Sequence, residues 1–333
     1  MPIYPCFKKI CLGLFFSGLL LTFGHGAKAL TVSPVLFDQN LDPGMSANGQ
    51  IGLTNDTNQT QTYYVSVQNF VANGEEGEQT FLEEKDTSGL AGWLKTEKDQ
   101  VTLAPTMQEN INWTINLPKN AEPGGHYAAV FFSTQPPTES QTAVGVGAKI
   151  GVLFLINVSG NIKEAASVET FRLMDSPDEN AKAVSVIERL PAYFELRVKN
   201  NGSVHIQPMG TVTIKNLFGS TVASIPANPA KSRVLPDSIR RIRPLWGIFE
   251  KDKTVGFWKN LQKEWTGFAL GRYTATLDAT YGTQHQPLQV SMAFWVFPWR
   301  LCLMALLLLI LLIVLLKVYN KMLIKSALRK TGK

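Results

Sequence analysis

The chain has 333 residues, with 32 Lys or Arg and 26 Asp or Glu, so its formal net charge is +6. The excess positive charge belongs to the two ends, because residues 30–299 hold 22 basic and 26 acidic residues. This central part lacks the basic footprint of a nucleic-acid-binding protein. It also contains no cysteine, which excludes disulfides there. Its stability must therefore come from hydrophobic cores, and about 270 residues are enough for two domains.

The N-terminus has the pattern of a signal peptide. Two lysines precede an uncharged apolar run over residues 10–23, and Ala27 and Ala29 form a small-residue cleavage site. We expect a signal peptide over residues 1–29, with cleavage between Ala29 and Leu30. The alternative, a first transmembrane helix, is disfavoured because the apolar run is short.

The C-terminus has the pattern of a membrane anchor. Residues 301–316 are apolar without interruption, close to the roughly 20 residues that span a bilayer. Residues 294–299 read Phe-Trp-Val-Phe-Pro-Trp, which is typical of an aromatic belt beside a snorkelling Arg300. We expect a transmembrane helix over 294–318. A basic cytoplasmic tail over 319–333 would place the ectodomain outside the cell membrane.

The ectodomain is rich in β-strand patterns. Residues 61–70 and 110–117 alternate between apolar and polar side chains, which is the period of a half-buried strand. Clusters of Gly, Pro and Asn separate such runs, and residues 88–94 suggest a brief helical turn. We predict an all-β protein with two tandem immunoglobulin-like β-sandwich domains, followed by one transmembrane α-helix.

A weak internal repeat supports two domains of one topology, over 30–160 and 161–293. Gly125-His-Tyr127 and Gly271-Arg-Tyr273 each lead into a strand pattern, and Asn55 and Asn200 each end one. The charge divides between the domains: residues 30–160 carry a net charge of −9, and residues 161–299 carry +5. We expect Tyr127 and Tyr273 to form tyrosine corners, with Gly125 and Gly271 allowing the tight approach.

The sequence shows no catalytic constellation. It contains no nucleophile elbow, phosphate-binding loop, dinucleotide-binding loop or zinc motif, and the histidines at 126, 205 and 285 are far apart. We therefore expect no catalytic residues, no cofactor and no metal, and a protein that is not an enzyme. The acidic run over 75–84 lacks the spacing of a calcium loop, which favours a solvated loop.

Residues 239–265 interleave aromatic and basic side chains. One interpretation is a long hairpin whose aromatic residues pack on the second domain. The other is an exposed surface for lipid headgroups, an anionic wall polymer or a partner protein. The candidate binding surface consists of Arg240, Arg241, Arg243, Trp246, Phe249, Phe257, Trp258 and Trp265.

The order of these motifs resembles that of the WxL-interacting cell-surface proteins of Gram-positive-type bacteria. The residues that carry the resemblance are Leu41-Asp-Pro-Gly44, Thr54-Asn55, Leu117-Pro118 with Gly124-Gly125, Asn200-Asn-Gly202 with Gly210, and Gly271-Arg-Tyr273. The resemblance implies a peptidoglycan-binding and a host-binding immunoglobulin-like domain before one membrane helix. The aromatic and basic segment at 239–265 has no place in that pattern.

Together these features predict a membrane-anchored bacterial surface protein for adhesion or scaffolding. Its partner would be peptidoglycan or another surface protein. The alternative is an anchored, chaperone-like sandwich protein that adds a strand to exported chains.

Overall fold

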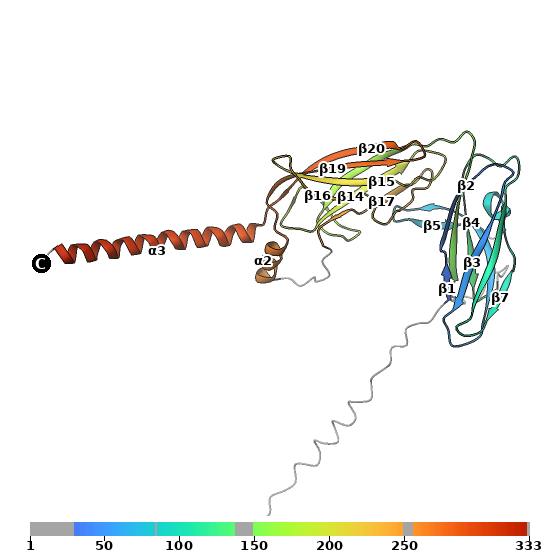
Figure 1. The fold of residues 1–333 in the computed structure, drawn as a ribbon, viewed down its shortest axis with the longest axis horizontal. Coiled ribbons are helices and arrows are strands. Elements are labelled where there is room, and N and C mark those ends of the chain that lie inside the picture. The colour runs from blue at the N-terminus through green and yellow to red at the C-terminus, as the bar shows by residue number, and fades with distance from the viewer. Residues whose placement is uncertain (1–29, 84, 137–148, 249–255, 332–333) are drawn as a thin grey trace, which may run out of the picture.

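The computed structural model describes residues 30–331, except 84, 137–148 and 249–255. The predicted signal peptide and its cleavage site before Leu30 lie outside these residues, as does Phe249. The fold is all-β apart from two short helices and one long C-terminal helix, which confirms the predicted fold class (Figure 1).

The distal domain is a sandwich of two sheets. The first sheet has four strands in the order β1 (Leu30–Ser33), β3 (Ser46–Asn55), β8 (Gln108–Asn116) and β6 (Leu94–Thr96). The second has the order β2 (Leu36–Leu41), β10 (Lys149–Val158), β9 (Gly124–Ser133), β4 (Gln61–Asn73) and β5 (Glu78–Phe81), with β7 (Gln100–Leu103) also on β4.

The alternating patterns place the distal core as predicted. In β8, Ile111, Trp113 and Ile115 are buried between the sheets, while the side chains between them face outward. The Trp113 ring meets Phe154 edge to face, with 5.0 Å between ring centroids. The expected helical turn is α1 (Gly89–Trp93), which inserts buried Leu90 into the same core.

The second domain, called proximal because it precedes the C-terminal helix, is another sandwich. One sheet has the order β12 (Ala183–Val184), β11 (Ala166–Met174), β14 (Ala192–Asn200) and β17 (Ile239–Ile242), with β18 (Leu245–Trp246) also on β14. The other has the order β13 (Val186–Ile187), β20 (Gln286–Val296), β19 (Gly271–Tyr281), β15 (Met209–Asn216) and β16 (Thr221–Pro226).

The two sandwiches follow one plan. In each, an early strand (β2 or β13) pairs in parallel with the last strand (β10 or β20). The rest of that sheet is antiparallel, and β9 and β19 occupy the same place beside the last strand. The repeated Gly-x-Tyr motifs begin these two strands, so the weak sequence repeat reflects a repeated topology.

Asn55 and Asn200 have equivalent roles at the ends of β3 and β14. Both are fully buried. The Asn200 amide donates to the carbonyl oxygens of Val204 and Val234, each at 2.8 Å, and its Oδ1 accepts the Gly202 backbone N–H. The Asn55 amide likewise donates to the carbonyl oxygens of Gln59 and Leu103. Each amide thus replaces strand pairing where the chain turns inside the sandwich.

The C-terminal helix begins later than the sequence predicted. It is α3 (Trp299–Thr331), and Phe294 to Val296 belong to β20. Phe294 is fully buried against Phe194 and Tyr273, so it belongs to the core and the belt assignment was wrong for it. The helix also continues through most of the predicted tail. Its candidate membrane span, Trp299–Lys325, has 27 residues, and its most apolar 18-residue stretch has a mean hydropathy of 3.2, so the helix is long and apolar enough to cross a membrane.

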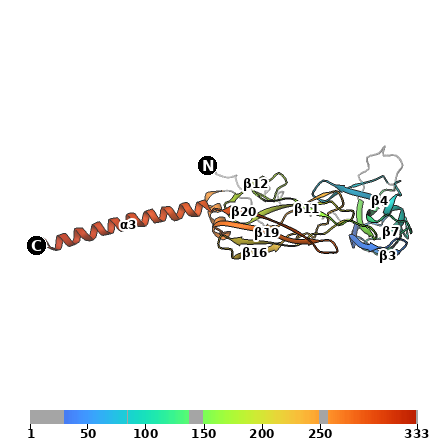
Figure 2. The ribbon, with the colours of Figure 1, turned by 90° about the horizontal axis from the view of Figure 1, so that it is seen from above.

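The arrangement in space is a bent rod. The long axes of the two sandwiches lie crosswise, and α3 leaves the proximal sandwich at the end farthest from the distal one (Figure 1). Seen from above, the three parts follow one another along a line (Figure 2). The bend between the sandwiches is therefore well separated from the helix.

Replacing Asn200 with Ala removes the buried amide that three backbone groups share. We expect the free energy of unfolding of the proximal sandwich to fall by roughly 2–4 kcal/mol, since buried carbonyl oxygens lose their donors. The measurement is a urea titration of residues 30–297, because neither core cluster includes a residue of α3.

The matched control is Asn201→Ala. Asn201 is exposed, and its amide bonds only the Ser167 hydroxyl at the surface. The urea midpoint of Asn201→Ala should stay close to that of the parent protein. Equal losses of unfolding free energy for both variants would contradict the structural role of the Asn200 amide.

Candidate functional site between the two sandwiches

An acidic hairpin of the distal sandwich joins the two domains. Glu75, in the turn between β4 and β5, accepts hydrogen bonds from the Arg197 guanidinium, with 2.8 Å from Nε to Oε2. The backbone oxygen of Glu75 accepts the Arg241 N–H at 2.8 Å. Arg243 donates from both Nη atoms to Glu76, each at 2.7 Å. The predicted solvated loop is in fact a charged domain contact.

A second contact lies on the other side of the hairpin. His205 Nε2 lies 3.0 Å from Asp38 Oδ1, and Arg233 also donates to this carboxylate. The Gly125 backbone N–H donates to the Ser203 oxygen at 2.8 Å. Opposite net charges on the two domains therefore meet as specific pairs.

These pairs shift the pKa values of the carboxylates. Hydrogen bonds and charge from Arg197, and then Arg241, lower the pKa of Glu75 below its usual 4.5. Burial raises the pKa of Asp38, but His205 and Arg233 outweigh it and hold that pKa below 3.8. Both carboxylates stay ionised at neutral pH, as an ionic contact requires.

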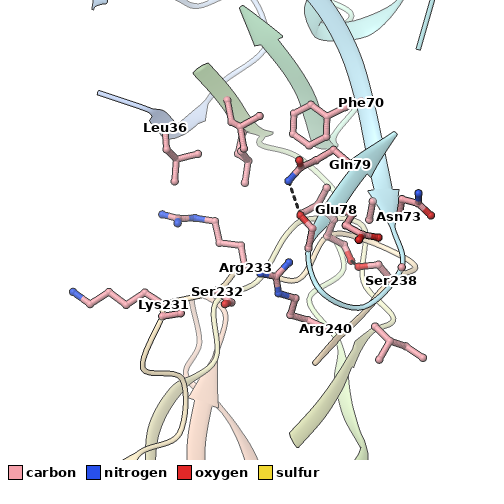
Figure 3. A pocket seen from close by; sticks show the side chains of 18 residues that line it. Leu36, Phe70, Asn73, Glu78, Gln79, Lys231, Ser232, Arg233, Ser238 and Arg240 are labelled. Carbon is pink, nitrogen blue, oxygen red and sulfur yellow. Dashed lines mark hydrogen bonds between the residues drawn. The ribbon is translucent and has the colours of Figure 1, made fainter. Parts of the chain in front are cut away.

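A pocket of about 300 Å³ lies beside these contacts (Figure 3). The distal sandwich contributes Leu36, Phe70 and Gln79, and the proximal sandwich contributes Arg233 and Arg240 on the facing side. Lys231 and Glu78 are also part of the lining. The pocket thus has a distal wall with both apolar and polar side chains, a largely cationic proximal wall and an opening to solvent.

Arg240 is the unusual member of the cationic wall. Burial lowers the pKa of its guanidinium, and its Nε is buried without a hydrogen-bond partner among the described residues. The guanidinium packs closely over Gly77, where any side chain would collide with it. A partly buried guanidinium that lines a pocket favours an anionic ligand there.

The apolar wall extends along the outer face of the distal sheet. Phe70, Ala129, Phe131 and Leu155 form a buried cluster on this face, separate from the distal core. Partly buried residues packed against it are Leu36, Tyr127, Leu153 and, from the proximal domain, Leu235. This sheet therefore has apolar side chains on both of its faces, unlike a sheet with one face turned to water.

The last strand of the distal domain also has an incomplete edge. Strand β10 pairs with β9 from Lys149 to Val158, but with β2 only from Leu153 onward. Among the described strands, residues 150–152 therefore pair with β9 only. A strand edge of this kind can accept an added strand.

The predicted binding surface at 239–265 is divided among three environments. Arg241 and Arg243 are held in the domain contact, Arg240 lines the pocket, and Trp246 packs near Tyr273 in the proximal core. The expected hairpin is wrong for the last part, which is helix α2 (Phe257–Thr266). Phe257, Trp258 and Trp265 are exposed on this helix.

The two tyrosines differ in their surroundings. The Tyr273 hydroxyl donates to the Leu270 oxygen at 3.4 Å, three residues upstream, at the long limit for a corner bond. The Tyr127 hydroxyl forms no such bond among the described residues, and its ring lies against His205 at the domain contact. Tyr127 is therefore not a corner, although Gly125 is needed because a side chain there would strike its hydroxyl.

Sequence reasoning missed the acidic hairpin, Asp38 and His205 as contact residues. The only available signal was the opposite charge of the two halves, which does not show which residues meet. Among the described residues, no group of three or more His, Cys, Asp or Glu is placed to hold a metal ion.

No family model and no curated protein matches the chain. Solved structures with a similar fold include a chain of a chaperone–tip adhesin complex of CFA/I fimbriae. It has 10% identity, covers 80% of this chain and 98% of its own, and gives a TM-score of 0.37. The class 5 fimbriae chaperone CfaA has 10% identity, 80% and 98% coverage and a TM-score of 0.34. The E. coli chaperone DraB has 9% identity, 81% and 96% coverage and a TM-score of 0.34. Similarities at this level assign no function to the chain.

Replacing Glu75 with Gln tests the charged contact. We expect the free energy of unfolding to fall by about 1–2 kcal/mol at neutral pH, because Arg197 and Arg241 lose their ionised acceptor. When the pKa of a carboxyl group is lower in the folded state, the group stabilises folding at pH values above its unfolded-state pKa. This stabilisation is lost as the pH falls through the folded-state pKa. The parent protein should therefore lose stability more steeply than Glu75→Gln below about pH 4.5.

Thermal unfolding of residues 30–297 at several pH values measures both effects. The control is Glu83→Gln, since Glu83 is an exposed carboxylate of the same domain with no ion pair across the contact. An identical pH slope for the parent protein and Glu75→Gln would refute the electrostatic role.

Proposed function

We propose that this protein is a membrane-anchored, chaperone-like binding protein. It holds extended segments of other extracytoplasmic proteins in the bend between its two sandwiches. Binding rather than catalysis is the proposed role. The observation that carries the proposal is the juxtaposition of an apolar sheet face with a cationic pocket at the domain contact.

An extended segment fits this arrangement better than a compact ligand. Alternate side chains of a strand point to the same face, so apolar ones can lie along the partly buried Leu36 and Leu153 in the pocket wall. Residues 150–152 offer backbone groups at the strand edge. Main-chain hydrogen bonds would supply affinity without sequence specificity, as a client-binding protein requires.

The cationic wall indicates the charge of the segment. Arg240 contributes a partly buried guanidinium, and Lys231 and Arg233 add positive charge beside it. A carboxylate, from an acidic side chain or a chain terminus, would receive charge-assisted hydrogen bonds there. Glu78 on the rim would oppose a second anion, so one carboxylate is the expected complement.

Helix α3 supports the anchoring part of the proposal. Its candidate span of 27 residues measures about 40 Å at about 1.5 Å per residue, against about 30 Å of bilayer hydrocarbon. The basic residues after it fit a cytoplasmic C-terminus, with both sandwiches on the other side of the cell membrane. The protein would then act on chains that have already been exported.

Wall-polymer binding remains the second candidate. It rests on the resemblance to the WxL-interacting cell-surface proteins and on the exposed aromatic residues of α2. The pocket between the domains favours a peptide with a carboxylate, because its apolar side chains lie opposite Arg233 and Arg240.

A short peptide of alternating apolar and polar residues with a free terminal carboxylate tests the proposal. Its affinity for residues 30–297 is measured by fluorescence anisotropy. Arg240→Gln should weaken binding roughly 10- to 100-fold, because a charge-assisted hydrogen bond is lost. Amidating the peptide terminus should weaken binding by the parent protein and change little for the variant.

The matched control is Arg272→Gln, on an exposed position of β19 away from the pocket. It should bind like the parent protein. Absence of peptide binding, together with co-sedimentation of the ectodomain with peptidoglycan, would overturn the proposal in favour of the wall-polymer reading.

A further inference from the structure

Large apolar side chains are exposed at the end of the proximal sandwich from which α3 leaves. Trp258 and Trp265 on α2 have exposed fractions of 71% and 74%. Exposed apolar surface on this scale marks a binding surface rather than chance. The other exposed members are Phe257, Phe268, Leu270, Trp295, Phe297 and Trp299.

Helix α2 has two different faces. Trp258 and Trp265 are seven residues apart, so they lie on one face about two turns apart. Glu264 lies on the other face and is fully buried. Lys259 and Lys263 are on the same short helix, which combines aromatic and cationic side chains. This composition is typical of a helix that lies in a membrane interface.

The buried carboxylate of Glu264 joins α2 to the start of α3. Its Oε1 accepts a hydrogen bond from Arg300 Nη1 at 2.7 Å, and its Oε2 accepts the Leu301 backbone N–H at 2.9 Å. The second bond satisfies one of the unpaired N–H groups in the first turn of α3, where a negative charge is favourable. The sequence predicted a snorkelling Arg300, but its guanidinium is instead bonded to Glu264 and Glu188.

The sandwich is tied to the same point. Glu188, next to β13, accepts hydrogen bonds from the Trp299 indole, at 2.9 Å, and from Arg300. Helix α2, the proximal sandwich and the first turn of α3 thus form one joint (Figure 1). The apolar run of α3 begins at Leu301, immediately after this joint.

We propose that the exposed face of α2, with Trp258 and Trp265, docks into the headgroup region of the bilayer that α3 crosses. The inference rests on the anchoring role of α3 given above. The joint places α2 level with the first turn of α3, which is where the bilayer surface lies. Indole rings are favoured at that level because they are apolar with one polar N–H.

The docked helix gives α3 a second point of attachment to the membrane. A single helix lets an ectodomain pivot about its exit point, whereas a second contact restricts that motion. The bend and its pocket, at the far end of the proximal sandwich, are then presented at a set height above the lipid.

Quenching of tryptophan emission by lipids brominated near the headgroup tests this inference. The full chain is placed in lipid nanodiscs, and the parent protein is compared with the double variant Trp258→Phe/Trp265→Phe. We expect the double variant to lose a large part of the lipid-quenched emission. The matched control Trp93→Phe, in the distal sandwich, should keep the lipid-quenched component intact.

A soluble quencher separates the possible outcomes. If the emission of Trp258 and Trp265 is quenched from water and not from lipid, the face is free for a protein or wall polymer and the inference is wrong. If alkaline carbonate extracts the chain from membranes, α3 does not anchor it, and the inference is overturned as well. Peptide binding by residues 30–297 does not involve these tryptophans, so it tests the proposed function independently.

Discussion

The ion pairs between the β4–β5 hairpin and the arginines of β14 and β17 are the interaction on which the shape of the ectodomain depends. Glu75 and Glu76 reach across the bend and are held by Arg197, Arg241 and Arg243. Ion pairs are directional when guanidinium and carboxylate meet through two bonds, so they define an angle as well as an attraction. The pocket beside them exists because that angle leaves a space between an apolar and a cationic wall.

The same hairpin explains how two domains with one plan acquire different tasks. The topology repeats, down to the buried amides of Asn55 and Asn200. The two equivalent hairpins do not repeat in charge. The turn of the distal hairpin, β4–β5, is acidic, whereas the turn of the proximal hairpin, β15–β16, carries the exposed Leu217 and Phe218. A repeated scaffold thus carries its specific features in the turns, which are the parts least constrained by the core.

A second joint, around Glu264 and Arg300, links the proximal sandwich to the apolar helix. It is also ionic, and it is buried on the side of Glu264. Apolar side chains lie beside both joints: the partly buried Leu36 and Leu153 at the bend, and the exposed Trp258 and Trp265 of α2. The two proposed binding surfaces therefore lie at opposite ends of the proximal sandwich.

Sequence patterns determined the local features of this protein. Alternation in β4 and β8, the run of apolar residues in α3 and the repeated Gly-x-Tyr motifs all depend on neighbours within a few residues, and the fold class followed from them. Only the tertiary structure decided which charges meet. Arg241 and Glu75 are far apart in the chain, and whether an arginine is exposed, paired or lining a pocket depends on the angle between two domains. For the same reason, the sequence predicted Phe294 in the membrane belt, although it belongs to the core. An aromatic residue just before an apolar helix has the same sequence pattern in either position, and only the pairing of β20 with β19 turns Phe294 inward.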